Sequence, residues 1–319
     1  MENELARAVL TADIKAQYDA QCKLVLSQKE VLAWILQGVA EEFAQMSVEE
    51  IKSCIEGTPE ISSEKIYSGQ AGERIVGIGN ESRITGEGSI YYDIRFLANI
   101  PQGRERIRLM INVEAQKDYY PGYQLPTRGI FYCARMISSQ LGTEFSGSDY
   151  DGLKKVYSIW ICMGVPKRIG NAIAQYRMEK RDICPGFPDL RKAYDKLTVV
   201  TVGLNGRIFC ENQLLGMLNT LLSPEIGGRE KKELLQRRYG MKMENELAKE
   251  VDQMCNLSGY VEEKGRQKGR MEGESRLAGL IRLLIQKGEY ENVRLVTEDE
   301  AARREFYRRY GLIDAASEN

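Results

Sequence analysis

Two stretches rich in β-branched, aromatic and aliphatic residues lie close together in the chain. They cover residues 90–100 and 107–116, and their composition predicts two strands that are largely covered on both faces. Pro101-Gln102-Gly103 lies between them. Because Pro suits position i+1 of a type I turn and Gly a following position, we expect the two strands to form a hairpin.

Charged and polar residues interrupt this apolar pattern. Asp93 lies inside the first predicted strand, and Glu114 and Gln116 end the second. Folding back near residue 103 brings Asp93 opposite a position between Ile111 and Glu114, so the two carboxylates should lie roughly 5–8 Å apart. Glu114 and Gln116 share a face in any register, whereas a slip by one residue would turn one carboxylate to the other face.

Two carboxylates on neighbouring strands repel each other and are costly to bury unless a positive charge lies between them. Magnesium prefers oxygen ligands, takes one or two protein carboxylates and leaves other positions for water and phosphate oxygens. Asp93 and Glu114 are therefore candidate metal ligands, with the Val113 carbonyl and the Gln116 amide nearby. The alternative is a pair of polar residues at strand ends, satisfied by neighbouring Arg or backbone groups.

Asp93 on one strand and Glu114-Ala115-Gln116 on the next resemble the motif of the PD-(D/E)XK nuclease superfamily. The pattern is most similar to the recombination-promoting nuclease and putative transposase families, where Glu-x-Gln often stands in place of Glu-x-Lys. The resemblance implies a restriction-endonuclease-like α/β fold, with a mixed β-sheet flanked by helices. It also implies a DNA endonuclease that uses magnesium, or manganese, with Asp93 and Glu114 as metal ligands and Gln116 as a residue that places the attacking water.

The chain departs from the superfamily pattern at two positions. The superfamily motif has Pro before the Asp, whereas this chain has Tyr92 before Asp93. Replacement of that Pro is common among superfamily members. Gln116 cannot carry the positive charge of Lys, so activation of the water would fall mostly to the metal. Lys117 follows, but in a regular strand it points to the opposite face, and only a bulge would let it replace Gln116. A catalytically inactive DNA-binding or protein-interaction module with this fold is the alternative function.

A helix is predicted over residues 125–141, directly after the Glu-x-Gln strand. Arg128, Tyr132 and Arg135 recur at i, i+4 and i+7 and so form one stripe along it. Arg offers a fixed fork of donors, and with Lys117 this stripe is a candidate phosphate and DNA-binding surface. Solvated arginines at the edge of the sheet are the alternative.

The chain before the hairpin also contains helical patterns. Apolar residues at helical spacing predict a helix over residues 29–42, and Ser47 with Glu50 three residues later is the capping-box pattern that begins another. Both helices are expected to pack against the sheet. The family resemblance makes Glu30 a candidate accessory acidic residue of the metal site.

An Asp-x-x-x-Lys spacing near the N-terminus is typical of the look-alike families, and Asp19 with Lys23 fits it. Further strands are predicted over residues 156–165 and 197–204, with another element over 169–176 and a short helix over 212–222. Strand and helix patterns alternate here, which predicts an α/β layer.

From Gly227 onward the sequence is charged and helical. Glycines recur at four-residue spacing at Gly265, Gly269 and Gly273, which suggests close helix–helix contact or a flexible linker. We therefore expect an N-terminal helical part over residues 1–57, a nuclease-like core over 58–225 and a charged helical C-terminal region over 226–319.

Composition excludes several kinds of chemistry. The chain has no histidine, which removes Ser-His and Cys-His catalysis and His-ligated zinc. Its 45 basic and 46 acidic residues give a net charge of −1, so contact with DNA would have to use local patches. Seven scattered cysteines without CxxC spacing suit a reducing compartment. With no signal-peptide pattern and no long apolar run, we expect a soluble cytoplasmic protein with no membrane partner, and a homo-oligomer stays open.

Overall fold

The computed structural model describes residues 16–61, 81–84, 88–102, 105–206, 210–243 and 245–312. The chain divides into two compact units, a larger one that ends at Ser258 and a smaller one that begins at Gly259. In these ranges, no helix combines the length and the apolar character needed to cross a lipid bilayer.

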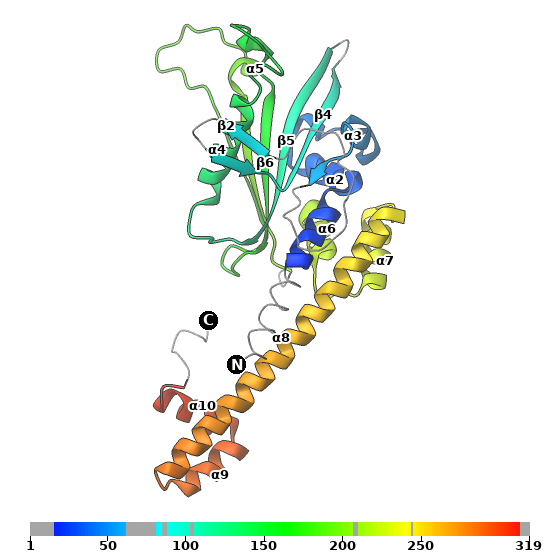
Figure 1. The fold of residues 1–319 in the computed structure, drawn as a ribbon. Helices are drawn as coiled ribbons and strands as arrows, with labels where there is room; N and C mark the ends of the chain where they lie inside the picture. Colours follow the sequence, from blue (N-terminus) through cyan, green and yellow to red (C-terminus); the bar gives the residue numbers. More distant parts are fainter. Residues whose placement is uncertain are drawn as a thin grey trace. The chain divides into compact units, whose positions relative to one another are not determined.

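A mixed β-sheet forms the centre of the larger unit (Figure 1). Its order is β1-β4-β5-β6-β8-β7. The strands are β1 (Glu60–Ile61), β4 (Ile94–Gln102), β5 (Glu105–Asp118), β6 (Lys155–Gly164), β7 (Ala172–Arg177) and β8 (Leu197–Gly203). β5, β6 and β8 are parallel neighbours, whereas β1 pairs antiparallel with β4, β4 with β5, and β7 with β8. The expected mixed α/β sheet is therefore confirmed.

The predicted hairpin is formed by β4 and β5. Ile94 lies opposite Val113, and Ile100 lies opposite Ile107. A separate two-stranded sheet pairs β2 (Glu81–Ile84) with β3 (Gly88–Tyr91). The expected first strand is thus divided, because β3 ends before Asp93 and β4 begins after it.

The turn residues differ from the prediction. Pro101 pairs with Arg106 and Gln102 pairs with Glu105, so both belong to the β4–β5 ladder rather than to a turn. In the described part of the chain, β1 pairs with β4 only at Ile94 and Arg95, and Ile55 bridges to Ala98, so no described residue on that side needs the N–H that Pro101 lacks.

Helices cover both faces of this sheet. One face carries the helix over residues 16–26 together with α2 (Lys29–Val39), α3 (Val48–Cys54) and α6 (Gln213–Leu222). The other carries α4 (Leu125–Ser138). Alternate residues of β5 serve the two layers, with Ile111 and Val113 in the first core and Met110 in the second.

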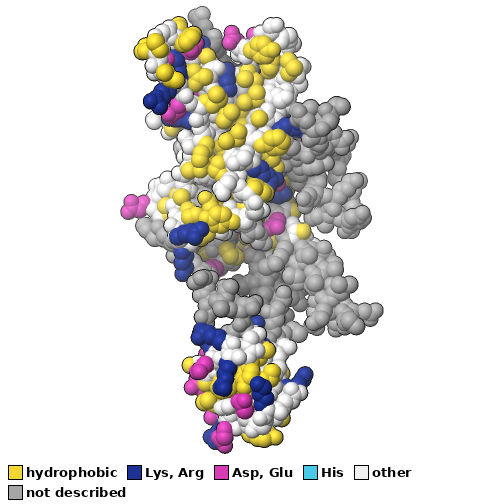
Figure 2. Space-filling view, turned by 90° about the vertical axis from the view of Figure 1, so that its left-hand side faces the viewer, with side chains coloured by type: hydrophobic (Ala, Val, Ile, Leu, Met, Phe, Trp, Pro, Cys, Tyr) yellow, Lys and Arg dark blue, Asp and Glu magenta, His cyan; other side chains and the backbone are white. Residues whose placement is uncertain are grey.

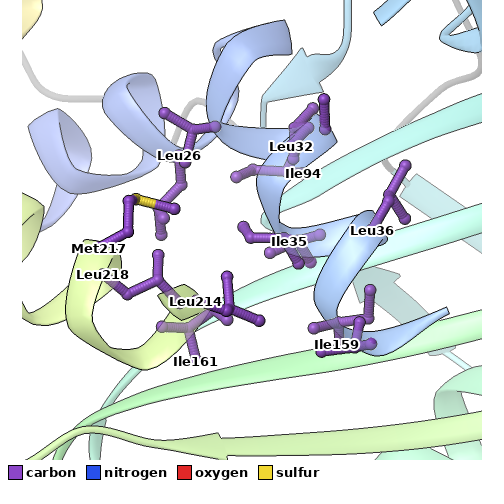
Figure 3. Close-up of a cluster of buried hydrophobic side chains, with 14 of the residues drawn as sticks. Leu26, Leu32, Ile35, Leu36, Ile94, Ile159, Ile161, Leu214, Met217 and Leu218 are labelled. Carbon is purple, nitrogen blue, oxygen red and sulfur yellow. The ribbon is translucent and has the colours of Figure 1, made fainter. Parts of the chain in front are cut away.

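Side chains of the first core interlock between helices and strands. Figure 3 shows Leu32 of α2 beside Ile94 of β4, and Leu214 of α6 beside Ile161 of β6. α2 ends at Val39 and is followed by the short 3-10 helix η1 (Glu41–Phe43), so the predicted helix is interrupted near its end. The capping box at the start of α3 is confirmed: Ser47 accepts a hydrogen bond from the Glu50 N–H, and the Glu50 carboxylate accepts one from the Ser47 N–H.

α4 lies very close to the sheet at Gly129. A Cβ atom at this position would lie 2.4 Å from Val199 Cγ1 and 3.0 Å from Trp160 Nε1. The helix predicted over residues 125–141 is confirmed as α4, but it already ends at Ser138. Short elements η2 (Tyr150–Gly152) and α5 (Arg191–Tyr194) lie in the connections around β6 to β8.

The larger unit includes more of the C-terminal sequence than composition suggested. α7 (Gly228–Tyr239) and the beginning of α8 (Asn245–Gln286) contribute Leu235, Val251 and Met254 to the first core. The smaller unit contains the rest of α8 with α9 (Tyr290–Glu298) and α10 (Glu300–Arg309), which pack around Leu280, Leu284, Val296 and Phe306.

The glycine repeat lies within one continuous helix. The backbone of α8 is helical through all three glycines, so the repeat is not a break in the chain's secondary structure. Among the residues that the structure describes, no atom lies within 4 Å of a Cβ added at Gly273.

Candidate functional site

The hairpin brings Asp93 and Glu114 together, as the strand pattern predicted. The Asp93 N–H donates to Glu114 Oε1 at 3.0 Å, and the Ala115 N–H donates to Asp93 Oδ2 at 3.0 Å. These crossed bonds follow from the register, in which the neighbouring pair is Ile94 opposite Val113. Each carboxylate is therefore oriented by the backbone of the other strand.

The carboxyl group of Glu114 is in an unfavourable place for a negative charge. Its residue is 5% exposed. Burial, and next the charge of Asp93, raise the pKa of Glu114 to about 8, although the Asp93 N–H and the charges of Arg128 and Lys23 act in the opposite direction. A proton or a cation is therefore needed at this carboxyl group near neutral pH.

Lys23 is the cation that the structure places against the pair. Its Nζ lies 2.7 Å from Asp93 Oδ1, and the two side chains are 19% and 18% exposed. Lys23 comes from the helix over residues 16–26, far from the hairpin in sequence. It was not among the predicted site residues, although the spacing of Asp19 and Lys23 was the signal that pointed to this part of the chain.

The other residues predicted for the metal site do not all lie near the acidic pair. Gln116 follows Glu114 by two positions on β5, so it shares that face, and it is partly exposed. The side chain of Lys117 lies outside the described part of the structure. Glu30 is engaged elsewhere, because Lys52 Nζ lies 2.7 Å from Glu30 Oε2.

Arg128 projects from the beginning of α4 into a set of aromatic rings. Its guanidinium lies 5.3 Å from the ring centre of Tyr123, 5.1 Å from that of Tyr132 and 5.3 Å from that of Trp160. Arg128 Nη2 also donates to the Tyr132 hydroxyl at 2.6 Å. Trp160 pairs with Glu114 across β5 and β6, so these contacts hold a fixed positive charge beside the acidic pair.

Arg135 has a different environment from Arg128. It is 3% exposed and lies near Tyr92. Burial raises the pKa of Tyr92 to about 12, although the charge of Arg135 acts in the opposite direction. Tyr132 is also buried and packs edge-on against Tyr92, with ring centres 5.3 Å apart. The stripe predicted on this helix therefore faces the sheet, and Arg128 is its more accessible arginine.

The donor set suits a hard divalent cation with few protein ligands. Among the residues that the structure describes, no three His, Cys, Asp or Glu side chains come together. Magnesium takes one or two protein carboxylates and fills its other positions with water or phosphate oxygens. Asp93 and Glu114 match that requirement, and a bound cation would add to the positive charge that Arg128 and Lys23 already place near Glu114.

Comparison with known proteins adds no family assignment. No protein-family model, no curated protein and no solved structure matches the chain. The resemblance to the PD-(D/E)XK superfamily therefore rests on Asp93, Glu114 and Gln116 and on the hairpin that carries them.

Proposed function

We propose that the chain is a magnesium-dependent DNA endonuclease of the PD-(D/E)XK type. One observation carries the proposal: two carboxylates from adjacent strands are fixed by crossed backbone hydrogen bonds, and one of them is buried beside the charge of the other. Holding like charges in this way costs free energy, which a bound divalent cation offsets.

Each residue near the pair has a role in this proposal. Asp93 and Glu114 would hold magnesium. The metal would lower the pKa of a bound water and neutralise charge on the phosphate. Gln116 shares the face of Glu114, so its amide can orient the water by hydrogen bonding. Arg128 offers a fixed guanidinium to a phosphate oxygen, because three aromatic rings hold it in place.

The ion pair between Lys23 and Asp93 favours a second function. A lysine at 2.7 Å already compensates part of the negative charge without a metal. The second candidate is therefore a non-catalytic module with the same fold that binds DNA or protein. Metal binding separates the two candidates, because only the nuclease needs Asp93 to exchange Lys23 for a divalent cation.

The test measures metal binding and cleavage in the same preparations. Calorimetric titration with manganese, and nicking of supercoiled plasmid in magnesium, would be followed for the wild type, Asp93→Asn and Glu114→Gln. We expect both substitutions to abolish binding and nicking while the fold is kept, since each removes charge repulsion. Full activity in either variant would reject the assignment.

Glu144→Gln is the matched control. Glu144 is another shielded carboxylate, with Oε1 2.8 Å from Arg108 Nη1, and Arg108 lies near the beginning of β5 rather than its end. This control should retain binding and nicking. A wild-type protein that binds no manganese and nicks no plasmid would favour the non-catalytic module.

A further inference from the structure

Three tyrosines follow directly after the end of β5, and a fourth lies on an edge strand of the sheet. Tyr119, Tyr120 and Tyr123 lie in the loop that joins β5 to α4, and Tyr176 lies on the edge strand β7. Tyr120, Tyr123 and Tyr176 are 55%, 44% and 40% exposed. Figure 2 shows hydrophobic side chains spread over the face of the larger unit on which α4 lies in Figure 1.

Two of these tyrosines contact each other. The ring centres of Tyr119 and Tyr120 lie 4.7 Å apart in an edge-on arrangement. Burial raises the pKa of Tyr119, and the charges of Tyr120 and Tyr176 raise it further. Tyr176 lies opposite Val199 of β8, and Val199 belongs to the core under α4, so Tyr176 is on the face of the sheet that carries α4.

Two arginines hold the exposed tyrosines by their hydroxyl ends. Arg168 Nη2 donates to the Tyr120 hydroxyl at 2.8 Å, and its guanidinium lies 5.7 Å from the centre of that ring. Arg128 Nη1 donates to the Tyr123 hydroxyl. The rings of Tyr120 and Tyr123 are therefore oriented, and each has a positive charge beside it.

This surface adjoins the acidic pair. Tyr119 follows Gln116 by three positions, directly after the end of β5. Arg128 links the two regions, because it contacts Tyr123 and its charge lowers the pKa of Glu114. If one phosphate of a DNA strand lay at Asp93 and Glu114, the adjacent nucleotides of that strand would therefore lie near the tyrosines.

We propose that Tyr120, Tyr123 and Tyr176, with Arg128 and Arg168, form a platform for the unpaired bases of single-stranded DNA. Aromatic rings stack on any base, but only unpaired bases offer a free face, since the bases of a duplex already stack on one another. The arginines match the phosphates that alternate with those bases. The position of the strand relative to the acidic pair rests on the proposed nuclease function.

The test is a binding titration of the full chain in metal-free buffer, which separates binding from cleavage. Fluorescence anisotropy would compare oligo-dT of about 15 nucleotides with a duplex of the same length. Tyr120→Ala and Tyr123→Ala should each weaken oligo-dT binding by about tenfold, whereas duplex binding should change by less than about twofold. Tyr120→Phe and Tyr123→Phe should keep the affinity, because they keep the ring.

Tyr150→Ala is the matched control. Tyr150 is 70% exposed and precedes β6, whereas the platform follows β5. Because β5 and β6 are parallel, the control tyrosine lies at the opposite end of the sheet. Its removal should leave oligo-dT binding unchanged.

The outcomes distinguish the platform from the nuclease. Equal loss of single-strand and duplex binding in the alanine variants, or no loss at all, would overturn the platform even if plasmid nicking continues. Tyrosine-dependent binding of oligo-dT without cleavage in magnesium would support the platform and reject the nuclease. Binding to oligo-rU about tenfold tighter than to oligo-dT would overturn the choice of DNA.

Discussion

The ammonium group of Lys23 lies 2.7 Å from the carboxylate of Asp93 and ties the helix over residues 16–26 to the beginning of β4. Both side chains keep some contact with solvent, at 19% and 18% exposed. A lysine in this position and a metal ion compete for the same carboxylate charge. In the proposed metal site, the strength of this ion pair would therefore affect how readily the acidic pair binds a cation.

Replacing Lys23 should strengthen metal binding. Lys23→Met keeps an unbranched side chain but removes the competing charge, so manganese affinity should rise by roughly fivefold, or about 1 kcal/mol for a partly exposed ion pair. Calorimetric titration measures the change, with Lys23→Arg as the charge-retaining control. Unchanged affinity in Lys23→Met would show that Lys23 does not compete with the metal.

The raised pKa of Glu114 makes the stability of the metal-free protein depend on pH. Folding raises this pKa from the ordinary value of 4.5 to about 8, so between these values the folded protein holds a proton that the unfolded chain releases. The free energy of unfolding should therefore fall as pH rises across this range. Urea unfolding at several pH values measures the slope.

Two variants and one addition check the origin of this slope. Glu114→Gln should flatten it, because the amide does not ionise. Asp93→Asn should flatten it in part, since the charge of Asp93 is the second cause of the raised pKa. Magnesium at alkaline pH should restore stability in the wild type alone. A slope shared by the wild type and Glu114→Gln would contradict the assignment.

The sequence predicted the pairing of Asp93 with Glu114 because a hairpin has few registers that keep its apolar faces buried. Ile94 opposite Val113 satisfies that requirement, and the carboxylates follow from it. The break before Ile94 was not predicted, since Tyr91 and Tyr92 suit a strand as well as they suit its end.

The partners of the pair were less predictable. Lys23 precedes Asp93 by 70 positions in the sequence, and the packing of its helix against the sheet brings the two together. Periodicity placed Arg128 and Arg135 on one stripe, but how far each is buried depends on how α4 lies on the sheet. Local spacing carries no information about that arrangement, whereas the close approach at Gly129 decides it.

Gln116→Lys tests how the water is placed. An amide can orient a water molecule but cannot stabilise developing negative charge as an ammonium group can, so the substitution should keep or raise the cleavage rate. Single-turnover cleavage in magnesium measures it, with circular dichroism to check the fold. A large loss of rate in a folded variant would mean that the amide of Gln116 has a role of its own.

Gly129→Ala tests the seating of α4. The new Cβ would meet Val199 Cγ1 at 2.4 Å, so the helix would have to move away from the sheet. Overpacking of this kind costs about 1–3 kcal/mol in the free energy of unfolding, which urea titration measures. Gly279→Ala is the control, because no atom of the described residues lies within 4 Å of an added Cβ there and alanine favours a helix by about 1 kcal/mol over glycine. Equal stability of Gly129→Ala and the wild type would show that α4 can move away from the sheet at little cost in free energy.

The two arginines of α4 should differ in their effect on DNA binding. Arg128 is partly exposed beside the acidic pair, so Arg128→Gln should remove one phosphate contact and reduce the slope of log affinity against log salt by about 0.9 on duplex DNA. Arg135 is 3% exposed, so Arg135→Gln should leave that slope unchanged and lower the free energy of unfolding instead. Anisotropy titrations over several salt concentrations, run in calcium to hold back cleavage, measure both slopes. A double variant whose slope equals that of Arg128→Gln would agree with this division, whereas a further reduction by Arg135→Gln would show that the buried arginine reaches phosphate.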